Sequence, residues 1–415
     1  MANSRKDSKG RVLRPGESER KDGYYIYQYK DVNNIRRVIY NRDLVKLRKQ
    51  EDSLTRDLLN GIDIYTGETT TLNEAFDRYI AGKSNLKQST RTNYKYMYDN
   101  YVRPTFGNRR LADIKYSDVK TFYQYLIDKK KFKPNSMEII NTILHPVFTM
   151  AHRDGIIRIN PSDGIMSEIK KSNIWEKPKR HALTYEQQKA FMKYTTESPI
   201  YNHWLPLFVT LLGTGCRIGE VIGLRWEDVD FEERIISINH NLIYRIQDSG
   251  KCEFHITTPK TKSGIRTIPM FDEVYEALQQ EEEQQKETGF NEDVIDGYSG
   301  FIFTNREHRV HNPMTINRAI RRIYEAYNAE EKEQAKKEKR KPILIPHFSC
   351  HHMRHTFCTR FCENETNIKV IQDIMGHADV TTTMDIYAEA TEVKKRQSFK
   401  NLQSTVYKGL HRVGI

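Results

Sequence analysis

The sequence lacks the features of a membrane protein and of a secreted, disulfide-bonded scaffold. Five cysteines in 415 residues are too few, and odd in number, for a disulfide framework, and they favour a reducing compartment. No apolar run approaches the roughly 18 residues that a membrane-spanning helix needs. The basic N-terminal segment contains no apolar stretch that could act as a secretory signal. We therefore expect a cytoplasmic protein.

Positive charge is in excess and is concentrated near the N-terminus. The chain carries 67 Lys and Arg against 55 Asp and Glu, a formal net charge of +12. Residues 1–50 hold eight Arg and six Lys against six acidic residues, so most of the excess lies there. A basic segment beside a large globular body favours a polyanionic partner such as nucleic acid, although a solubilising tail has the same composition.

Residues 1–70 are interpreted as a small β module that begins with a basic leader. Aromatic and β-branched residues predict its strands, and Asn60-Gly61 is typical of a helix end. The predicted elements are a disordered leader, two strands, a helix and a linker, at residues 1–22, 23–30, 35–40, 43–59 and 61–71. An ordinary surface hairpin is the alternative reading of this segment.

Residues 71–165 are predicted to form a helical domain. Its predicted helices lie at residues 72–80, 89–101, 117–129 and 136–152, and several of them open on Ser or Thr, which are preferred N-caps. Tyr94, Tyr98 and Tyr101 recur at helical spacing, which favours a core position over a base-stacking surface. A second linker is expected from residue 159 to residue 178.

Residues 180–390 form the largest predicted unit, which mixes helices and strands. The predicted strands lie at residues 235–238, 254–257 and 266–269. The predicted helices lie at residues 203–212, 272–286, 315–327, 354–363 and 368–375, and the charge run 328–341 is interpreted as a solvated helix extension. The sequence thus predicts a multidomain α+β fold, in which a mainly helical domain carries a small antiparallel sheet.

Two short stretches in this unit combine cations with turns. Arg217 follows a Gly-rich turn and opens a helix, where its guanidinium group can face an anion. Lys260 and Lys262 lie between two predicted strands, which puts them on a hairpin tip. Each stretch alone is weak evidence, because glycine turns and exposed hairpin lysines are common.

A third stretch crowds histidines around Arg354. His351 and His355 have the i, i+4 spacing of zinc ligands. His352, however, stands where a metalloprotease needs a glutamate, and Arg354 would repel a metal ion. Arginine and histidine together suit a phosphate better, so a zinc hydrolase is kept only as an alternative.

The motifs occur in a definite order, at residues 214–217, 259–261, 351–355 and 376–377 and at Tyr387. Together they resemble the tyrosine recombinases of the phage-integrase family. That family has a T-G-x-R turn, a Lys on a β-hairpin, an H-x-x-R-H box, a G-H box and then a nucleophilic tyrosine. The resemblance implies a DNA strand transferase that needs no metal and no cofactor.

The resemblance also implies the chemistry of the reacting groups. Tyr387 would attack a DNA phosphodiester and form a 3′-phosphotyrosine, which keeps the energy of the broken bond, so that rejoining needs no ATP. Lys260 would protonate the departing 5′-oxygen, and Lys262 is the alternative. His351 would assist proton transfer at the nucleophile.

Four further residues are implied as supports of this reaction. Arg217 and Arg354 would clamp the non-bridging phosphate oxygens, and His377 would donate another hydrogen bond to them. Glu220 would orient the region around Arg217. Gly219 stands where the family usually has Ser or Ala, and we expect little cost beyond the roughly 1 kcal/mol by which glycine weakens a helix.

The order of the predicted domains resembles integrases of conjugative transposons and lambda-like phages. The resemblance implies that residues 1–70 bind arm-type DNA sites and that residues 71–165 bind core-type sites, with catalysis in residues 180–390. It implies a homotetramer on double-stranded DNA, with an excisionase and a host DNA-bending protein as accessory partners. Residues 391–415 are either a tail exchanged between protomers or a frayed basic terminus.

Two other functions are compatible with the sequence. A type IB topoisomerase shares the tyrosine, arginine, lysine and histidine chemistry but relaxes DNA without exchanging partners. A non-catalytic DNA-binding protein would leave all five motifs without a purpose. The predicted function is site-specific recombination that integrates and excises a mobile element.

Overall fold

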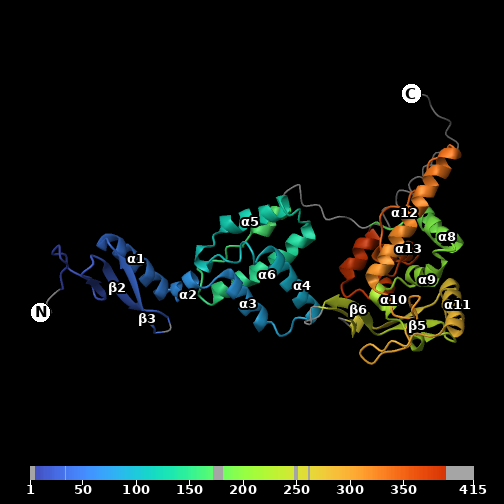
Figure 1. Cartoon of the computed structure of the whole chain (residues 1–415), viewed down its shortest axis with the longest axis horizontal. Coiled ribbons are helices and arrows are strands. Elements are labelled where there is room, and N and C mark those ends of the chain that lie inside the picture. The colour runs from blue at the N-terminus through green and yellow to red at the C-terminus, as the bar shows by residue number, and fades with distance from the viewer. Residues whose placement is uncertain (1–4, 33, 172–180, 247–250, 260–261, 389–415) are drawn as a thin grey trace, which may run out of the picture. The chain divides into compact units, whose positions relative to one another are not determined.

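The computed structural model describes residues 5–32, 34–171, 181–246, 251–259 and 262–388 (Figure 1). The chain divides into two compact units, Met1–Pro178 and Lys179–Ile415. Both units combine helices with small antiparallel sheets, which confirms the predicted α+β fold class. None of the described helices is both long and apolar enough to cross a lipid bilayer.

The first unit begins with a three-stranded antiparallel sheet in the order β1-β2-β3 (Figure 1). The strands are β1 (Glu17–Glu19), β2 (Tyr25–Lys30) and β3 (Arg36–Asn41). Helix α1 (Leu44–Leu59) follows, and Asp43 caps its first turn through the amides of residues 45 and 46. Tyr25, Leu44 and Leu47 form the small core between sheet and helix. The two predicted strands and the predicted helix are confirmed.

The prediction of a disordered leader is wrong for residues 5–22. Strand β1 pairs with β2, and an isolated bridge joins Lys6 to Val12. Glu17, only 1% exposed, accepts hydrogen bonds from Nε and Nη2 of Arg48, each at 2.9 Å. These contacts join residues that are far apart in sequence, so local composition does not reveal them.

Both predicted linkers contain helices. Asp63 caps α2 (Ile64–Thr69) by accepting a hydrogen bond from the amide of Thr66 at 3.1 Å. Helix α7 (Ile165–Lys171) places the fully buried Ile165 against the core of the helical domain. Both segments predicted as linkers therefore contain a short helix, which the sequence analysis did not predict. Residues 172–178 of the second linker lie outside the described residues.

The helical part of the first unit agrees with the sequence. Its helices are α3 (Leu72–Gly82), α4 (Gln88–Tyr101), the 3-10 helix η1 (Leu111–Asp113), α5 (Tyr116–Asp128) and α6 (Pro134–Arg153). Tyr98 is completely buried and stacks on Phe76 with ring centroids 3.6 Å apart. The core position predicted for this tyrosine is confirmed, and Tyr94 and Tyr101 pack against the same core.

The second unit is built around the buried helix α9 (Leu205–Thr214), which contacts α11 (Asp272–Thr288) and α13 (Cys350–Asn364). Its other helices are α8 (Tyr185–Glu197), η2 (Asn202–Trp204), α10 (Ile218–Ile222), η3 (Trp226–Asp228), η4 (Lys262–Gly264), α12 (Pro313–Lys337) and α14 (Ile368–Met375). Residues 380–388 are also helical. The charge run forms the predicted extension of α12 as far as Lys337, although Glu331 and Ala335 in it are buried.

Two small sheets complete the second unit. One has the order β4-β5-β8, and the other is the hairpin β6-β7. The strands are β4 (Val229–Asp230), β5 (Ile235–Ile238), β6 (Asn241–Ile246), β7 (Cys252–Thr257) and β8 (Arg266–Pro269).

The predicted pairing of residues 254–257 with residues 266–269 is wrong. Strand β7 pairs with β6, which the sequence analysis did not predict, and β8 pairs with β5. The segment between β7 and β8 therefore connects two different sheets and is not a hairpin tip.

Candidate active site

Arg217 stands at the N-cap of α10, where the chain turns between two helices. Its backbone amide donates to Oε2 of Glu220 at 2.9 Å, and its Nη1 donates to Oε1 of the same carboxylate at 2.7 Å. The side chain is still 42% exposed. Glu220 thus fixes the orientation of Arg217 while part of the guanidinium group faces outward.

Arg354 lies in the first turns of α13 and is only 4% exposed. Its Nη1 donates to the carbonyl oxygen of Gly215 at 2.8 Å, and its Nη2 donates to that of Met375 at 2.6 Å. Burial, together with the neighbouring cations Arg217 and Arg266, lowers the pKa of Arg354 to about 10. The group remains positively charged at neutral pH.

The carbonyl end of α14 is where the arginines meet. The last carbonyl groups of a helix have no partner within it and carry partial negative charge. Three guanidinium groups each donate to one of three consecutive carbonyls at this end: Arg266 Nε to Ile374 (2.7 Å), Arg354 Nη2 to Met375 (2.6 Å) and Arg217 Nη2 to Gly376 (3.1 Å).

Gly376 is required at this turn for two reasons. Its φ is +60°, a left-handed conformation that costs other residues free energy. A Cβ atom at this position would also lie 2.9 Å from Nη1 of Arg266. The predicted G-H box therefore forms the tight end of α14, whose carbonyl groups accept hydrogen bonds from the arginines.

His377 follows this turn directly and is 7% exposed. Its Nδ1 lies 2.9 Å from Oγ1 of the buried Thr383, which belongs to the helix 380–388. Burial, and then the positive charges of Arg354 and Arg217, lower the pKa of His377 to about 4. The imidazole is therefore neutral at pH 7.

Glu220 is a buried carboxylate between two arginines. Its Oε2 accepts a hydrogen bond from Nη2 of Arg266 at 2.8 Å, in addition to those from Arg217. Burial acts to raise the pKa of Glu220, but the ion pairs with Arg266 and Arg217 outweigh it and lower the pKa to about 2. Glu220 is therefore ionised throughout the neutral range.

His351 lines a cleft that is also lined by Arg217 and Arg354, the two residues predicted to bind the phosphate. The cavity has a volume of about 390 Å³, and its walls include His351, Arg217, Arg354, Tyr244 and Arg245. Helix α13 begins four residues before the predicted start, so His351 lies in its first turn and not in the preceding loop. The structure thus brings His351 together with the two arginines.

Tyr387 lies on the helix 380–388, which begins shortly after His377. It is half-buried and packs, with Ile386, against a cluster of four buried residues. Those residues are Cys358, Cys362, Ile371 and Met375. The cluster includes the end of α14, so the helix of Tyr387 and the arginine-bound turn share one packed unit.

The predicted lysine cannot be located in the same way. Lys260 lies outside the described residues, and so does the side chain of Lys262, which keeps the choice between them a prediction. Gly264, two residues later, accepts a hydrogen bond from Nη1 of Arg266 at 3.2 Å. The chain that follows the two lysines therefore reaches the arginine cluster.

Sequence reasoning missed Arg266 and underrated Gly219. Arg266 looks like an ordinary strand residue in the sequence, and only its tertiary contacts reveal it. At Gly219, a Cβ atom would overlap Oδ1 of Asn241 and would lie 2.7 Å from the carbonyl oxygen of Leu242. Glycine thus allows β6 to pack directly on α10, a reason for this residue that the sequence did not contain.

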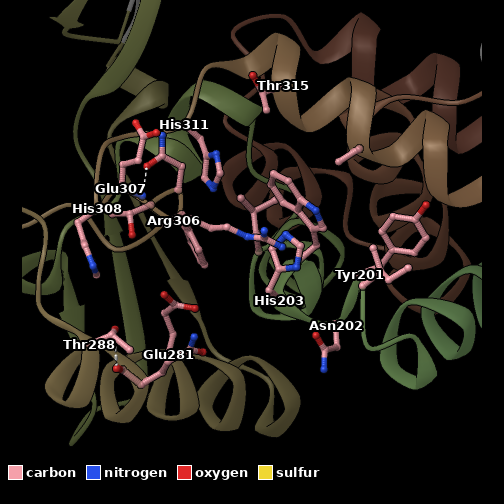
Figure 2. A pocket seen from close by; sticks show the side chains of 18 of the residues that line it. Tyr201, Asn202, His203, Glu281, Thr288, Arg306, Glu307, His308, His311 and Thr315 are labelled. Atoms are coloured by element: carbon pink, nitrogen blue, oxygen red, sulfur yellow. Dashed lines mark hydrogen bonds between the residues drawn. The ribbon is translucent and has the colours of Figure 1, made fainter.

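A larger cavity of about 830 Å³ lies in the second unit, and none of the predicted site residues lines it. Figure 2 shows Tyr201, His203, Glu281, Arg306 and His311 around it. His311 lies 4.8 Å from the ring of Trp204, and burial lowers its pKa to about 4. The acidic, basic and histidine side chains around this cavity do not form an arrangement that indicates a particular reaction.

No group of three or more His, Cys, Asp or Glu side chains in the described ranges is arranged to hold a metal ion. The alternative of a zinc hydrolase therefore gains no third ligand beside His351 and His355 among those residues.

Comparison with protein families assigns most of the chain. A family described as "Phage integrase family" matches residues 181–393. The chain belongs to this family, the tyrosine-type site-specific recombinases. Two further families match this integrase: "DNA binding domain of tn916 integrase" at residues 1–58 and "Phage integrase, N-terminal SAM-like domain" at residues 71–127.

Curated relatives of this integrase are similar over nearly its whole length. It is 31% identical over 404 residues to the transposase from transposon Tn916 of Enterococcus faecalis, covering 94% of this chain and 95% of that protein. The same identity and coverage hold for the transposase from transposon Tn1545 of Streptococcus pneumoniae.

Solved structures agree with this assignment. The Tn1549 transposon integrase in complex with transposon right end DNA is 29% identical, with a TM-score of 0.68, covering 80% of this chain and all of that chain. A lambda integrase tetramer bound to a Holliday junction shares the fold at 18% identity, with a TM-score of 0.55 and coverage of 89% and 98%.

Proposed function

We propose that this integrase cuts and rejoins DNA through a 3′-phosphotyrosine at Tyr387, and so integrates and excises a conjugative transposon. The main observation behind the proposal is that Arg217 and Arg354 both donate hydrogen bonds to carbonyl groups of the turn before His377. This arrangement brings the two guanidinium groups to one cleft, where no Asp or Glu among the described residues lines the wall, and it places the neutral imidazole of His377 directly after the turn that they bind. The similarity to the Tn916 and Tn1545 transposases supports the same function.

The proposed cleavage step balances as a phosphoryl transfer. Oη of Tyr387 bonds to phosphorus as the bond from phosphorus to the 5′-oxygen breaks, with His351 assisting removal of the tyrosine proton. Lys260 gives a proton to the departing 5′-oxygen, which leaves as a hydroxyl group. Rejoining is the reverse attack by a 5′-hydroxyl, so the number of phosphodiester bonds is unchanged and no ATP is consumed.

The arginines would supply most of the electrostatic stabilisation. Negative charge on the transferring phosphoryl group is best met by donors that are already in place. Arg354 is held rigidly by two carbonyl groups, and the half-exposed Arg217 can turn its remaining donors to a phosphate oxygen. His377, neutral at pH 7, would donate one more hydrogen bond, and Glu220 would hold Arg217 in place.

DNA binding would be divided among the parts of the chain. We assign arm-type sites to residues 1–70, core-type sites to residues 71–165 and strand transfer to residues 180–390. The match of residues 1–58 to the DNA-binding domain of the Tn916 integrase supports the first assignment. A homotetramer on DNA, with residues 391–415 exchanged between protomers, is proposed by similarity to the tetrameric lambda integrase. An excisionase and a host DNA-bending protein are proposed as accessory partners.

Covalent trapping on a nicked suicide duplex tests the proposed function. The duplex would carry a candidate transposon-end core site, and EDTA would be present without ATP. Wild type should give a covalent adduct on a denaturing gel, and Tyr387→Phe should give none. Tyr185→Phe, which removes an exposed hydroxyl group in the same unit, is the matched control and should behave as wild type.

Three outcomes would contradict the proposal in different ways. An adduct that survives Tyr387→Phe would mean that another residue is the nucleophile. Loss of the wild-type adduct with EDTA would indicate metal-dependent chemistry. Relaxation of supercoiled DNA without strand exchange between two marked duplexes would identify a topoisomerase.

A further inference from the structure

Arg266 is a buried guanidinium group that no predicted role explains. It lies at the start of β8, and its side chain is 5% exposed. It donates through Nε to Ile374 O at 2.7 Å, through Nη1 to Gly264 O at 3.2 Å and through Nη2 to Glu220 Oε2 at 2.8 Å. A charge this deeply buried costs several kcal/mol unless it is paired and hydrogen-bonded, and here it is both.

We propose that Arg266 is a positioning residue for strand cleavage: it ties Glu220 to the carbonyl end of α14, so that Arg217, Arg354 and His377 face one phosphate. The inference rests on the proposed function and names a residue that this function had not included. Arg266 does not line the cleft that Arg217, His351 and Arg354 line, so it acts through the groups that it holds.

The first of these groups is Glu220, which also orients Arg217. Oε2 of Glu220 accepts from Nη2 of Arg266 and from the backbone amide of Arg217, and Oε1 accepts from Nη1 of Arg217. Any rotation of this carboxylate would therefore move the guanidinium group of Arg217. Arg266 restrains that rotation through its hydrogen bond to Oε2.

The second group is the end of α14, which carries His377. Arg217 and Arg354 bind the carbonyls of Gly376 and Met375, but both are needed to bind the phosphate as well. Arg266 binds the preceding carbonyl, of Ile374, and has no access to the cleft. It can therefore keep the turn in place when Arg217 and Arg354 also bind a phosphate.

The balance of charge supports the same role. The cluster contains three guanidinium groups and one carboxylate, so it has a net positive charge before DNA binds. Partial charges of the helix carbonyls offset part of the repulsion. The negative charge of a phosphate entering the cleft would reduce the repulsion further, so the cluster should be more stable when DNA is bound.

Lysine cannot replace arginine here. The planar guanidinium group presents donors in several fixed directions, whereas an ammonium group is a point charge on a flexible stem. The Arg266 donors reach Glu220, Ile374 and Gly264, which belong to three different segments. A lysine would keep the charge beside Glu220 and lose the connection to α14.

The test compares Arg266→Lys with wild type in the full chain, on the suicide duplex used for Tyr387. We expect the rate of adduct formation at saturating protein to fall roughly 10- to 100-fold, because the catalytic groups are displaced by a fraction of an ångström or more. The dissociation constant for the same duplex should stay within about threefold, because Arg266 does not contact DNA. This separation of rate from binding is not expected from a general loss of folding.

Arg225→Lys is the matched control. Arg225 is also largely buried, and its Nε donates to Asp228 Oδ2 at 3.2 Å, but it contacts no residue of the site. Arg225→Lys should lower the melting temperature about as much as Arg266→Lys does, but it should keep the wild-type rate of adduct formation. If Arg266→Lys does not fold, Glu220→Gln tests the contact between Arg266 and Glu220 by changing the carboxylate. It should likewise lower the rate of adduct formation and change the dissociation constant little.

The outcomes separate this inference from the proposed function. An absence of any Tyr387-dependent adduct in wild type would overturn the proposed function itself. Wild-type activity together with an unchanged rate in Arg266→Lys would overturn only the role of Arg266. An unchanged rate in Glu220→Gln would overturn the proposed role of Glu220 as well. A double variant, Arg266→Lys with Glu220→Gln, should lose less than the sum of the two single losses, because the link from Glu220 to α14 runs through both residues; fully additive losses would also overturn the role of Arg266.

Discussion

Nη2 of Arg354 donates a hydrogen bond to the carbonyl oxygen of Met375 at 2.6 Å, across 21 residues of sequence. Its other described hydrogen bond, from Nη1, also goes to a carbonyl group, that of Gly215. Carbonyl groups orient a guanidinium group without neutralising its charge. Arg354 is therefore both immobile and electrostatically available, which is the state that a phosphate-binding group needs before DNA arrives.

The first prediction concerns Arg354→Lys. A lysine would keep the charge but lose the pair of bonds to Gly215 and Met375 and the second donor to a phosphate. The rate of adduct formation on the suicide duplex should fall by about 100-fold or more, the usual cost of removing one preorganised donor. Arg360→Lys, on the same helix, should keep the rate, because Arg360 bonds Glu363 and the carbonyl of Leu183. Equal rates in both variants would contradict the phosphate role of Arg354.

Much of the fold could be predicted from local sequence, because its helices have amphipathic faces and some of them, such as α1 and α3, have capping side chains. The exceptions depend on distant contacts. The leader is ordered by pairs such as Glu17 with Arg48, which are 31 residues apart. Strand β6 was not predicted, and its pairing with β7 changes the partner of β8 and so removes the predicted hairpin.

The site was predictable only to the extent that its motifs are local. Arg217, His351, Arg354, His377 and Tyr387 stand in short patterns that resemble a family. Arg266 stands in no such pattern, since its role arises where β8, α10 and α14 meet. The residues around Arg266 in the sequence therefore give no local signal that these three elements meet there.

The second prediction concerns Gly219→Ala, which adds only a methyl group. The new Cβ would overlap Asn241 and lie 2.7 Å from the carbonyl oxygen of Leu242, so β6 would have to move away from α10. We expect a loss of about 1–3 kcal/mol in the free energy of unfolding, the usual cost of overpacking. Urea unfolding of the full chain, followed by tryptophan fluorescence, would measure it.

Gly82→Ala is the control for this substitution. A Cβ at Gly82 would meet no atom within 4 Å, so this variant should be neutral or slightly stabilising. If Gly219→Ala were as stable as Gly82→Ala, the direct packing of β6 on α10 would be wrong.

The third prediction concerns the pH dependence of stability between pH 5 and pH 7. The folded protein holds the pKa of His377 at about 4, below the ordinary value of 6.5. The unfolded chain therefore binds more protons in this interval, and stability must fall as the pH falls. His377 should contribute on the order of 1–2 kcal/mol to the difference in unfolding free energy between pH 7 and pH 5.

Two variants isolate this contribution. His377→Gln should reduce the difference between the two pH values, and His311, whose pKa burial also lowers to about 4, should account for part of what remains. His347→Gln, which changes an exposed histidine in the same unit, should leave the difference unchanged. A wild-type pH dependence in His377→Gln would show that His377 is not held neutral by the fold.

The fourth prediction concerns Arg48→Met in the N-terminal sheet. Glu17 is 1% exposed, and Arg48 donates two hydrogen bonds of 2.9 Å to its carboxylate, so the substitution leaves a buried charge without its cation. The local stability of β1 and β2 should fall by about 2–4 kcal/mol. Amide hydrogen exchange of the full chain would report this loss as faster exchange in these two strands, with α3–α6 unchanged.

The charge argument is checked by a second substitution in the same pair. Adding Glu17→Gln to Arg48→Met should restore part of the protection, because a neutral amide costs less to bury than a carboxylate. Arg56→Met removes an exposed arginine from the same helix α1 and should have no effect on β1. Rapid exchange of β1 in wild type would mean that residues 5–22 are disordered, as the composition of the sequence indicates, and that the pair of Glu17 with Arg48 does not hold them.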